Sequence, residues 1–413
     1  MTIAANDIHP GGAEHVKGGP GRDREVIGNI EELRKILPAI DERRAAEMRA
    51  VTERYPFRVP RYYVEHVLRN DPADPLWELA LPGAEELADA GTERWDTFQL
   101  EGKAAEHPRW IQKYRYEVLI RMTNFCSGLC RYCYLKNREN IEGFISHADI
   151  DAMFEQAERN PPGRELREVV LSGGDPLTVP GEYLEHLAER VERLGAVVGK
   201  RVTVTVHTRE PVWYPNRILR NRGLIAALTK LRPSSYILHV VHPREVTRGL
   251  HEAMEMLAGL AEKRGSRRQP LMMTQHPLFR GINNDHRIIT EMYDALDSGE
   301  VVVKPYYLIH PFPDGTLPRH RLRLKESQEI LRGLASAPGT RVPLLTVPTP
   351  MGKCVIGPWE DLVDRGGYYL LHTKDGVPVQ YTTGEGYAGG SERGHIPVGV
   401  TVGATAQVST NGH

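Results

Sequence analysis

The sequence predicts an α/β fold in which helices cover a parallel sheet. Six short runs rich in β-branched residues alternate along the chain with amphipathic stretches of helix length. The runs are almost continuously apolar, which is typical of parallel strands buried on both faces. We expect strands over residues 117–123, 168–174, 201–208, 236–241, 270–278 and 301–310. Six strand–helix units are too few for a closed eight-unit barrel.

The segments between these strands predict the covering helices. Their expected ranges are 148–159, 181–194, 216–231, 244–263 and 285–298. Ahead of the sheet, residues 29–115 are expected to form a helical N-terminal region, in which Asp41 can cap a helix. The barrel is expected over residues 116–340, followed by a C-terminal segment over 341–383.

Both ends of the chain have the composition of segments without a fixed fold. Residues 1–28 contain PGG and KGGPG among scattered charges, and residues 384–413 contain GEGYAGGSERGH. Segments of this kind offer little apolar surface to offset the entropy of ordering them. We therefore expect a disordered N-terminal arm and a flexible C-terminal tail.

Composition argues against several classes of partner. Lys and Arg number 53 and Asp and Glu number 54, so no net field attracts nucleic acid or an anionic membrane surface. The sequence contains no apolar run long enough to span a bilayer. With four cysteines in 413 residues and no hydrophobic leader, the chain is expected to be cytoplasmic, where thiols stay reduced.

Three of the four cysteines stand within eight residues, in a C-x3-C-x2-C pattern formed by Cys126, Cys130 and Cys133. A cubic [4Fe-4S] cluster is usually held by four thiolates, so three leave one iron open to a small molecule. A structural zinc site is an alternative, but it needs a fourth ligand, and Cys354 is far downstream. A disulfide fits a reducing compartment less well.

Polar residues stand where the expected strands end, the edge at which βα-barrels carry their chemistry. The second strand ends in Ser172, Gly173, Gly174 and Asp175, and glycines there let a ligand approach the backbone. The same residues are also typical of a tight turn. Later strand ends carry His207, Arg209, His239, His242, Gln275, His276, Tyr306, Tyr307 and His310. Together they predict a polar cavity, although each histidine alone also fits a structural role.

Two further groups of residues are candidates for binding anions and amines. Lys113, Tyr114 and Arg115 precede the first strand and could bind an anion, or could form a solvated basic edge. Lys353 lies in TVPTPMGKCVIGP, on an expected loop beyond the sixth strand. Its amine could form a Schiff base with pyridoxal phosphate (PLP), although most lysines are simply exposed.

The cysteine loop, with Tyr132 before its last cysteine, resembles the cluster loop of the radical SAM superfamily. From about Asn29 to about Tyr381 the chain also resembles the lysine 2,3-aminomutase family. The matching blocks keep their order: EELRKILP, PRYYVEHV, DPADPLWELALP, VVLSGGDPL, TREPVWYPNRI, HPREVT, TQHPLFRGINND and VKPYYL. The resemblance implies a partial (βα)6 TIM-like barrel of the radical SAM type, with a helical N-terminal extension and a C-terminal extension.

The resemblance also implies cofactors, partners and a reaction. The cofactors are a [4Fe-4S] cluster on the three cysteines, S-adenosylmethionine (SAM), and PLP on Lys353. SAM is expected to contact Ser172, Gly173, Gly174, Asp175, His207, Arg209, His239 and Gln275, and the PLP phosphate to contact Lys113, Tyr114 and Arg115. The reaction is a 1,2-amino migration on a free amino acid, started by a 5′-deoxyadenosyl radical. A flavodoxin or ferredoxin-like electron donor and a homo-oligomer are expected.

Departures from the family bear on the substrate. Carboxylates that bind the lysine side chain in relatives are replaced around Thr346 to Thr349 and near Phe312, which argues against lysine. The arginine that binds the substrate carboxylate matches Leu135 here, a change that removes a bidentate contact. Cysteines that hold a zinc between subunits in relatives are missing. Lys136, Arg138, His310 and Asp314 are the remaining candidates for substrate contacts.

Two alternative functions follow from the same residues. The first keeps both cofactors but lets the substrate radical end in oxidation, decarboxylation or cyclisation. The second is a cluster-binding protein without catalysis. Net oxidation would consume SAM, whereas an isomerase would recycle it.

Overall fold

The computed structural model describes residues 25–88, 107–133, 135, 143–159, 165–263, 265, 268–311, 317–336, 341–349 and 352–382. Of the expected N-terminal arm only residues 25–28 are described, and the expected tail at 384–413 lies outside the described residues. Strand β1, Val26–Ile27, pairs with β2, Val59–Pro60. The disordered arm expected over residues 1–28 therefore includes residues that belong to the fold.

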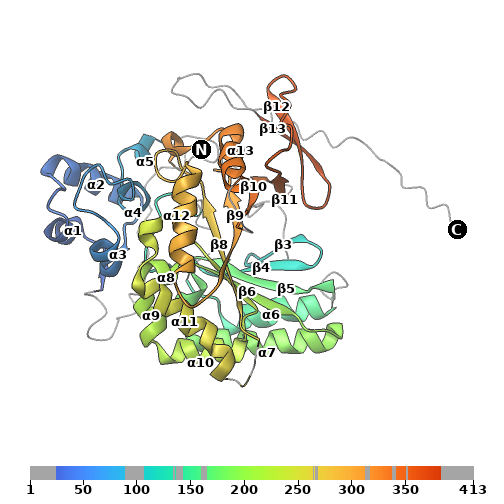
Figure 1. The fold of residues 1–413 in the computed structure, drawn as a ribbon. Coiled ribbons are helices and arrows are strands. Elements are labelled where there is room, and N and C mark those ends of the chain that lie inside the picture. Colours follow the sequence, from blue (N-terminus) through green and yellow to red (C-terminus); the bar gives the residue numbers. More distant parts are fainter. Residues whose placement is uncertain are drawn as a thin grey trace, which may run out of the picture.

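A nine-stranded sheet forms the centre of the molecule, in the order β11-β10-β9-β8-β7-β6-β5-β4-β3 (Figure 1). Seven of its strands run parallel: β4 Glu117–Thr123, β5 Glu168–Gly173, β6 Thr203–Thr208, β7 Ser235–Leu238, β8 Leu271–Pro277, β9 Val303–Ile309 and β10 Leu344–Thr349. The edge strands β3, Trp110–Tyr114, and β11, Gly352–Ile356, are antiparallel to their neighbours. The partial barrel and its six predicted strands are confirmed. The sheet gains a seventh parallel strand and two edges that were not predicted.

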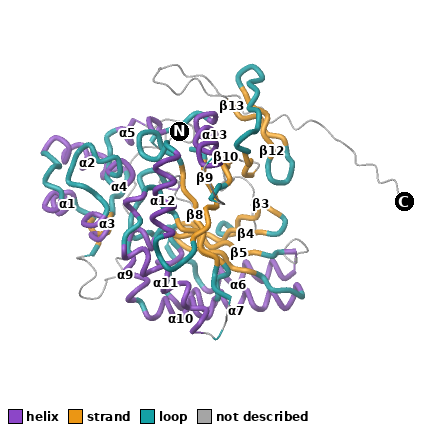
Figure 2. Tube along the Cα trace, viewed as in Figure 1, coloured by secondary structure: helices purple, strands orange, loops and turns teal. Residues whose placement is uncertain are grey.

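Helices surround the sheet (Figure 2). They are α6 His147–Arg159, α7 Gly181–Val198, α8 Glu210–Trp213, α9 Pro215–Arg220, α10 Arg222–Leu231, α11 Arg248–Lys263, α12 His286–Asp297 and α13 Leu324–Ala335. Short 3-10 turns that lie wholly within the described residues connect some of them: η3 Pro176–Thr178, η4 Pro243–Glu245 and η5 Pro318–His320. The helix expected over 216–231 is two helices, because the Asn221 side chain accepts from Leu224 N and starts α10 there.

The N-terminal layer consists of short helices on one side of the barrel, next to α8 and α9 (Figure 1). These are α1 Ile30–Ile36, α2 Glu42–Arg54, α3 Arg61–His66, α4 Trp77–Ala80 and α5 Glu85–Ala88. Asp41 accepts a hydrogen bond from Arg44 N, which confirms the expected cap. Tyr63 fixes the layer to the barrel, with its ring 4.2 Å from the Trp213 ring.

The C-terminal part of the described chain adds a hairpin beside the sheet. Strands β12, Tyr368–His372, and β13, Pro378–Thr382, pair with each other in antiparallel register. An isolated bridge between Cys354 and Thr373 joins the start of its turn to β11. Lys353 therefore lies on an edge strand of the sheet, and the expected loop placement is wrong.

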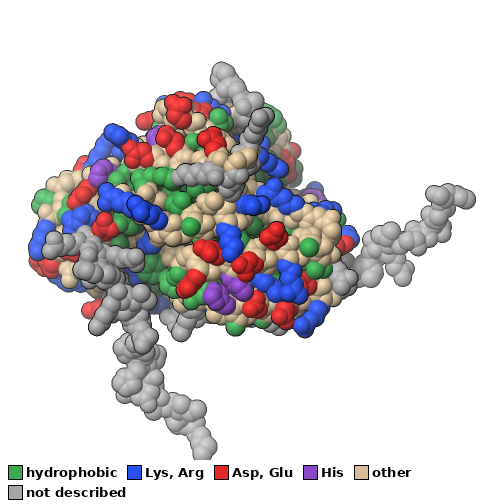
Figure 3. All heavy atoms as spheres, turned by 90° about the horizontal axis from the view of Figure 1, so that it is seen from below, with side chains coloured by type: hydrophobic (Ala, Val, Ile, Leu, Met, Phe, Trp, Pro, Cys, Tyr) green, Lys and Arg blue, Asp and Glu red, His purple; other side chains and the backbone are tan. Residues whose placement is uncertain are grey.

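Acidic and basic side chains are interspersed on the face of the molecule seen in Figure 3, without a large patch of one charge. This agrees with the formal net charge of −1 at pH 7. Among the described helices, none combines the length and the apolar character that a bilayer crossing requires.

A buried ion pair fixes the N-terminal layer to the segment after β4. The Arg131 guanidinium donates from Nε and Nη2 to Glu86, and the two side chains are 1% and 0% exposed. Arg131 Nη1 also donates to Pro56 O at 2.8 Å, and Glu86 accepts from Gly83 N at 2.9 Å. Two charges removed from water are tolerated only when such additional hydrogen bonds satisfy them.

Replacing Glu86 with Gln keeps the shape of the side chain but leaves Arg131 as an uncompensated buried cation. We expect the free energy of unfolding to fall by about 3–5 kcal/mol, as measured by urea titration. The matched control is Glu155→Gln on α6, whose ion pair with Arg159 is 47% and 79% exposed. That change should cost less than about 0.5 kcal/mol. Equal losses in both variants would contradict the assigned role.

Candidate active site

The cysteine-bearing segment follows β4 and is held by the N-terminal layer. Leu129 N donates to Arg58 O, and Arg131 N donates to Leu79 O, both at 2.9 Å. The Arg58 guanidinium donates to Cys126 O at 2.9 Å and lies 4.3 Å from the Phe125 ring centroid. The layer that precedes the barrel therefore determines how the three cysteines are presented.

Two glycines allow this segment to pack closely. A Cβ on Gly128 would meet the Trp213 ring at 2.5 Å, and a Cβ on Gly174 would meet Phe125 O at 2.3 Å. Gly174 N also donates to Thr123 O at 2.6 Å. The Gly-Gly turn after β5 therefore packs against the backbone that leads into the cysteines.

The three thiols lie close enough to affect one another. Burial raises the pKa of Cys126 well above its usual range, with further contributions from Asp175, Cys133 and Cys130. Among the described residues, no three His, Cys, Asp or Glu side chains stand ready as metal ligands. Three neighbouring cysteines on one loop are the donor set that an iron–sulfur cluster requires, and they would bind iron as thiolates.

The carboxylate of Asp175 is used by the protein itself. It accepts hydrogen bonds from Leu177 N, Thr208 Oγ1, Arg209 N and Glu210 N at 2.7–3.0 Å. These bonds tie the end of β5 to the end of β6. The SAM contact expected for Asp175 is therefore not available through its carboxylate in this arrangement.

Arg209 connects the cysteine segment to the barrel interior. Its guanidinium donates to His239 O at 3.0 Å and to Glu245 Oε1 at 2.6 Å, and it lies 5.8 Å from the Tyr132 ring centroid. Cys130 is among the groups that act electrostatically on Arg209. Because both hydrogen bonds are internal, Arg209 orients its neighbours rather than presenting a free cation.

A group of polar side chains lies beyond Arg209. His207 and His239 meet edge to face with their ring centroids 5.9 Å apart, and Gln275 Nε2 lies 3.3 Å from His239 Nε2. Burial lowers the pKa of His239 to about 3 and that of His207 well below its usual range, so both rings are neutral. Gln275 Oε1 is buried without a hydrogen-bond partner within the described structure. An unsatisfied buried oxygen beside neutral rings fits a ligand that supplies donors.

Lys353 points into the same interior from β11. Its Nζ lies 4.5 Å from the Tyr307 ring centroid, and its charge acts on His207, His239 and Glu117. Its backbone N–H donates to Tyr114 Oη at 2.9 Å, which bridges the two edges of the open sheet. Burial first, then the charge of Lys374, lowers the pKa of Lys353 to about 8. A lysine with this pKa is partly neutral near pH 8 and can act as a nucleophile.

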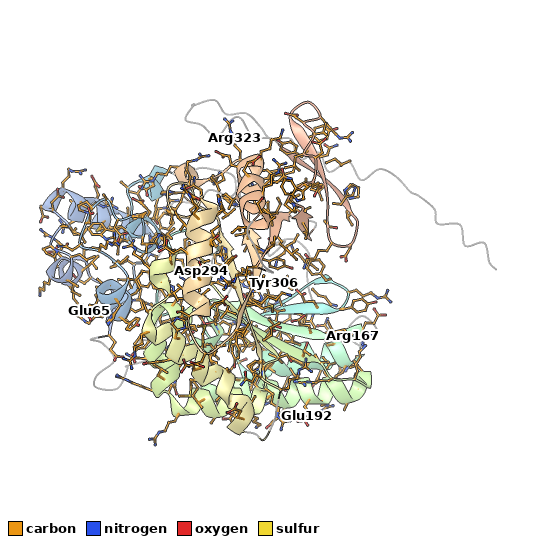
Figure 4. All side chains as sticks on the ribbon, viewed as in Figure 1. Glu65, Arg167, Glu192, Asp294, Tyr306 and Arg323 are labelled. Atoms are coloured by element: carbon orange, nitrogen blue, oxygen red, sulfur yellow. The ribbon has the colours of Figure 1, made fainter. Side chains whose placement is uncertain are left out.

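Three residues of this site were missed by the sequence analysis or not given a role there. Glu117 starts β4, Tyr307 lies on β9, and Lys374 lies in the turn between β12 and β13. Figure 4 labels Tyr306 in the middle of the molecule, and its ring stacks on Tyr307 at 3.7 Å between centroids. The two adjacent tyrosines could be recognised in the sequence of the strand. The sequence around Lys374 does not indicate that it lies beside them.

Several expected site residues lie elsewhere. Arg115 is bound to Glu165 with its side chain 66% exposed, so it does not contribute to the interior. His310 has both ring nitrogens in use, 2.9 Å from Ser327 Oγ and 2.9 Å from Tyr381 Oη, and is not free for a substrate. Lys113 lies on β3 beside Tyr114. Lys136, Arg138 and Asp314 lie outside the described residues.

Much of the chain is similar in sequence to known proteins. The sequence profile of the Radical SAM superfamily matches residues 120–291. The chain is 28% identical to the L-lysine 2,3-aminomutase of Clostridium subterminale over 376 residues, which cover 87% of this chain and 84% of that protein. It is 27% identical to the glutamate 2,3-aminomutase of Clostridioides difficile strain 630 over 360 residues, or 86% of this chain and 80% of that protein.

Among solved structures, a radical SAM methyltransferase from Sphaerobacter thermophilus matches 57% of this chain and 68% of its own at 16% identity, with a TM-score of 0.37. The sequence matches to the two aminomutases extend far beyond the cysteine segment on both sides. Residues 120–291 thus match the Radical SAM superfamily, and most of the chain is similar in sequence to lysine and glutamate 2,3-aminomutases.

Proposed function

We propose that the chain is a radical SAM enzyme that uses PLP to move the amino group of a free amino acid to the neighbouring carbon. The substrate is an amino acid other than lysine. The observation that supports this most is the hydrogen bond from Arg209 to His239 O, since the charge of Arg209 is affected by Cys130 and the His239 ring by Lys353. Radical generation and amine binding would then share one interior.

The bound cofactors would supply a reductively formed deoxyadenosyl radical and an electron-accepting pyridine ring for the amine nitrogen. Cys126, Cys130 and Cys133 would hold the cluster, and Arg58 keeps their segment in place. Lys353 would hold PLP through its amine, whose lowered pKa favours the neutral form. Each of these roles is assigned to a group that the fold desolvates or holds in position.

Neutral histidines suit a site for SAM, whose sulfonium is a cation. His207 and His239 stay uncharged because burial lowers their pKa values. A protonated ring in either place would repel the sulfonium in a medium of low dielectric constant. Gln275 Oε1 can accept a hydrogen bond from the ligand at the same place.

The segment around β10 supports a substrate other than lysine. Thr346 and Thr349 are 0% and 2% exposed. Their hydroxyls donate to Leu308 O at 3.2 Å and Gly352 O at 2.6 Å. These residues stand where the resemblance expects a carboxylate for a side-chain ammonium. Buried hydroxyls bonded to the backbone offer no negative charge to such a group.

Replacing any one of Cys126, Cys130 or Cys133 with Ala should abolish iron binding. After anaerobic reconstitution, the wild type should hold about four iron atoms per chain and each variant close to none. The control is Cys354→Ala, because that sulfur is buried on β11 and outside the triplet. Iron analysis and the visible spectrum measure the outcome. Iron loss in the control alone would contradict the assignment.

Lys353 should be the residue that binds PLP covalently. Borohydride reduction of the PLP-treated protein, followed by peptide mass spectrometry, should label Lys353 in the wild type. Labelling should rise with pH through about 8, where the amine loses its proton. Lys353→Ala should lose the label, and Lys325→Ala on α13 should keep it. A label retained in full by Lys353→Ala would remove the proposed role.

The reaction itself is tested anaerobically with SAM, PLP, dithionite and a panel of amino acids. An aminomutase should convert one of them, other than lysine, to its β-amino isomer without net loss of SAM. Mass spectrometry of amino acids and of 5′-deoxyadenosine reads both quantities. Stoichiometric 5′-deoxyadenosine with an oxidised or decarboxylated product would favour the alternative radical outcome. Conversion of lysine alone would refute the substrate assignment.

A further inference from the structure

The turn between β12 and β13 brings a second lysine to Lys353. Lys374 N donates to Lys353 O at 3.1 Å, and Thr373 bridges Cys354 on the neighbouring strand. Thr373 also closes the turn, because its carbonyl accepts from Gly376 N at 2.9 Å and its hydroxyl from Val377 N at 3.1 Å. Lys374 is thus held in a fixed register beside Lys353.

Both lysine amines lie over one tyrosine ring. The Nζ atoms of Lys353 and Lys374 are 4.5 Å and 4.9 Å from the Tyr307 ring centroid, and Lys374 Nζ also donates to Tyr307 Oη. Tyr306 donates its own hydroxyl to Tyr307 Oη at 2.9 Å. The ring face attracts each ammonium, but it cannot cancel the repulsion between them.

The two lysine amines beside Tyr307 have no paired carboxylate within the described structure. Within the described structure, neither Lys353 nor Lys374 has a carboxylate within ion-pair distance, and Glu117 acts on both only from farther away. The other groups that face Lys353 are Tyr114 from β3, His207 from β6, His239 from β7 and Tyr307 from β9. None of these four carries a negative charge near neutral pH. Asp375 acts on Tyr114 and Glu168 on Tyr307, but neither carboxylate is among the groups that act on Lys353. An anionic oxygen group would balance the two amines.

We propose that Lys374 is an anion-binding residue of the Lys353 site, contacting the phosphate of PLP or the carboxylate of the amino acid. This inference rests on the proposed function only for the identity of these ligands. Lys374 is exposed and Lys353 is half-buried, so Lys374 can meet a ligand at the entrance while Lys353 binds deeper. Ammonium donors recognise phosphate and carboxylate through charge-assisted hydrogen bonds.

The first test needs neither cofactor nor activity. Competitive acetylation across pH, read by mass spectrometry, gives the pKa of Lys353 in the full chain. Lys374→Gln should raise that pKa because a neighbouring cation is removed. Inorganic phosphate should raise it in the wild type and not in Lys374→Gln. Lys325→Gln is the matched control, since Lys325 lies on α13 over the Tyr369 ring rather than over the Tyr307 ring. The proposal would be overturned if Lys353 had the same pKa in Lys374→Gln as in the wild type, or if phosphate raised that pKa equally in both proteins.

The second test separates the two anions. Titrations with PLP and with pyridoxal, which lacks the phosphate, are compared in the wild type, Lys374→Gln and Lys374→Arg. If Lys374 binds the phosphate, Lys374→Gln should weaken PLP binding by about tenfold and leave pyridoxal unchanged, with partial recovery in Lys374→Arg. If it binds the carboxylate, PLP binding stays unchanged and the PLP-loaded protein binds an amino acid more weakly, but not its amide. If PLP, pyridoxal, the amino acid and its amide all bind unchanged, both assignments are refuted.

The two tests also distinguish this inference from the proposed function. If Lys353 takes up no PLP in the wild type, the proposed function fails. The pKa of Lys353 and its response to phosphate still decide whether Lys374 binds an anion.

Discussion

The buried ion pair between Arg209 and Glu245 joins the parts of the protein on which the site depends. Glu245 accepts from Arg209 and from Tyr63 of the N-terminal layer, each at 2.6 Å, and from Val241 N at 2.7 Å. Arg209 in turn holds His239 O and faces Tyr132 of the cysteine segment. A charge pair without access to water is stable only if its remaining hydrogen bonds are satisfied, so layer, barrel and cysteine segment must be placed together.

Desolvation gives the interior its chemical character. Burial keeps His207 and His239 neutral and lowers the pKa of Lys353 to about 8, so its amine loses its proton more readily than a lysine amine in water. An amine that is readily deprotonated suits an electrophilic aldehyde, and neutral imidazoles suit a sulfonium. Lys374 lies at the exposed side of the same ring, where an anionic group could enter.

Much of the fold could be predicted because its signals are local. The apolar runs of β4 to β9 and the amphipathic α7 and α12 appear in the sequence as strands and helices of nearly the right length. The antiparallel edges β3 and β11 could not be recognised in this way. An edge strand is defined by its partner, and β11 pairs with β10 only through a tight return of the chain. Asn221 likewise divides an expected helix through one side-chain hydrogen bond.

The sequence by itself determined the chemistry that lies within a few residues: three cysteines on one loop, a Gly-Gly turn after a strand, and a lysine beside a glycine. Tertiary structure decided which polar groups remain free for ligands. Asp175 is occupied by Thr208 and its neighbours, and His310 by Tyr381, 71 residues away. Only folding brings Lys374 to Lys353 and Tyr307. Hydrogen bonds and charges act across space, so separation along the chain does not reveal whether a side chain is already bound within the protein.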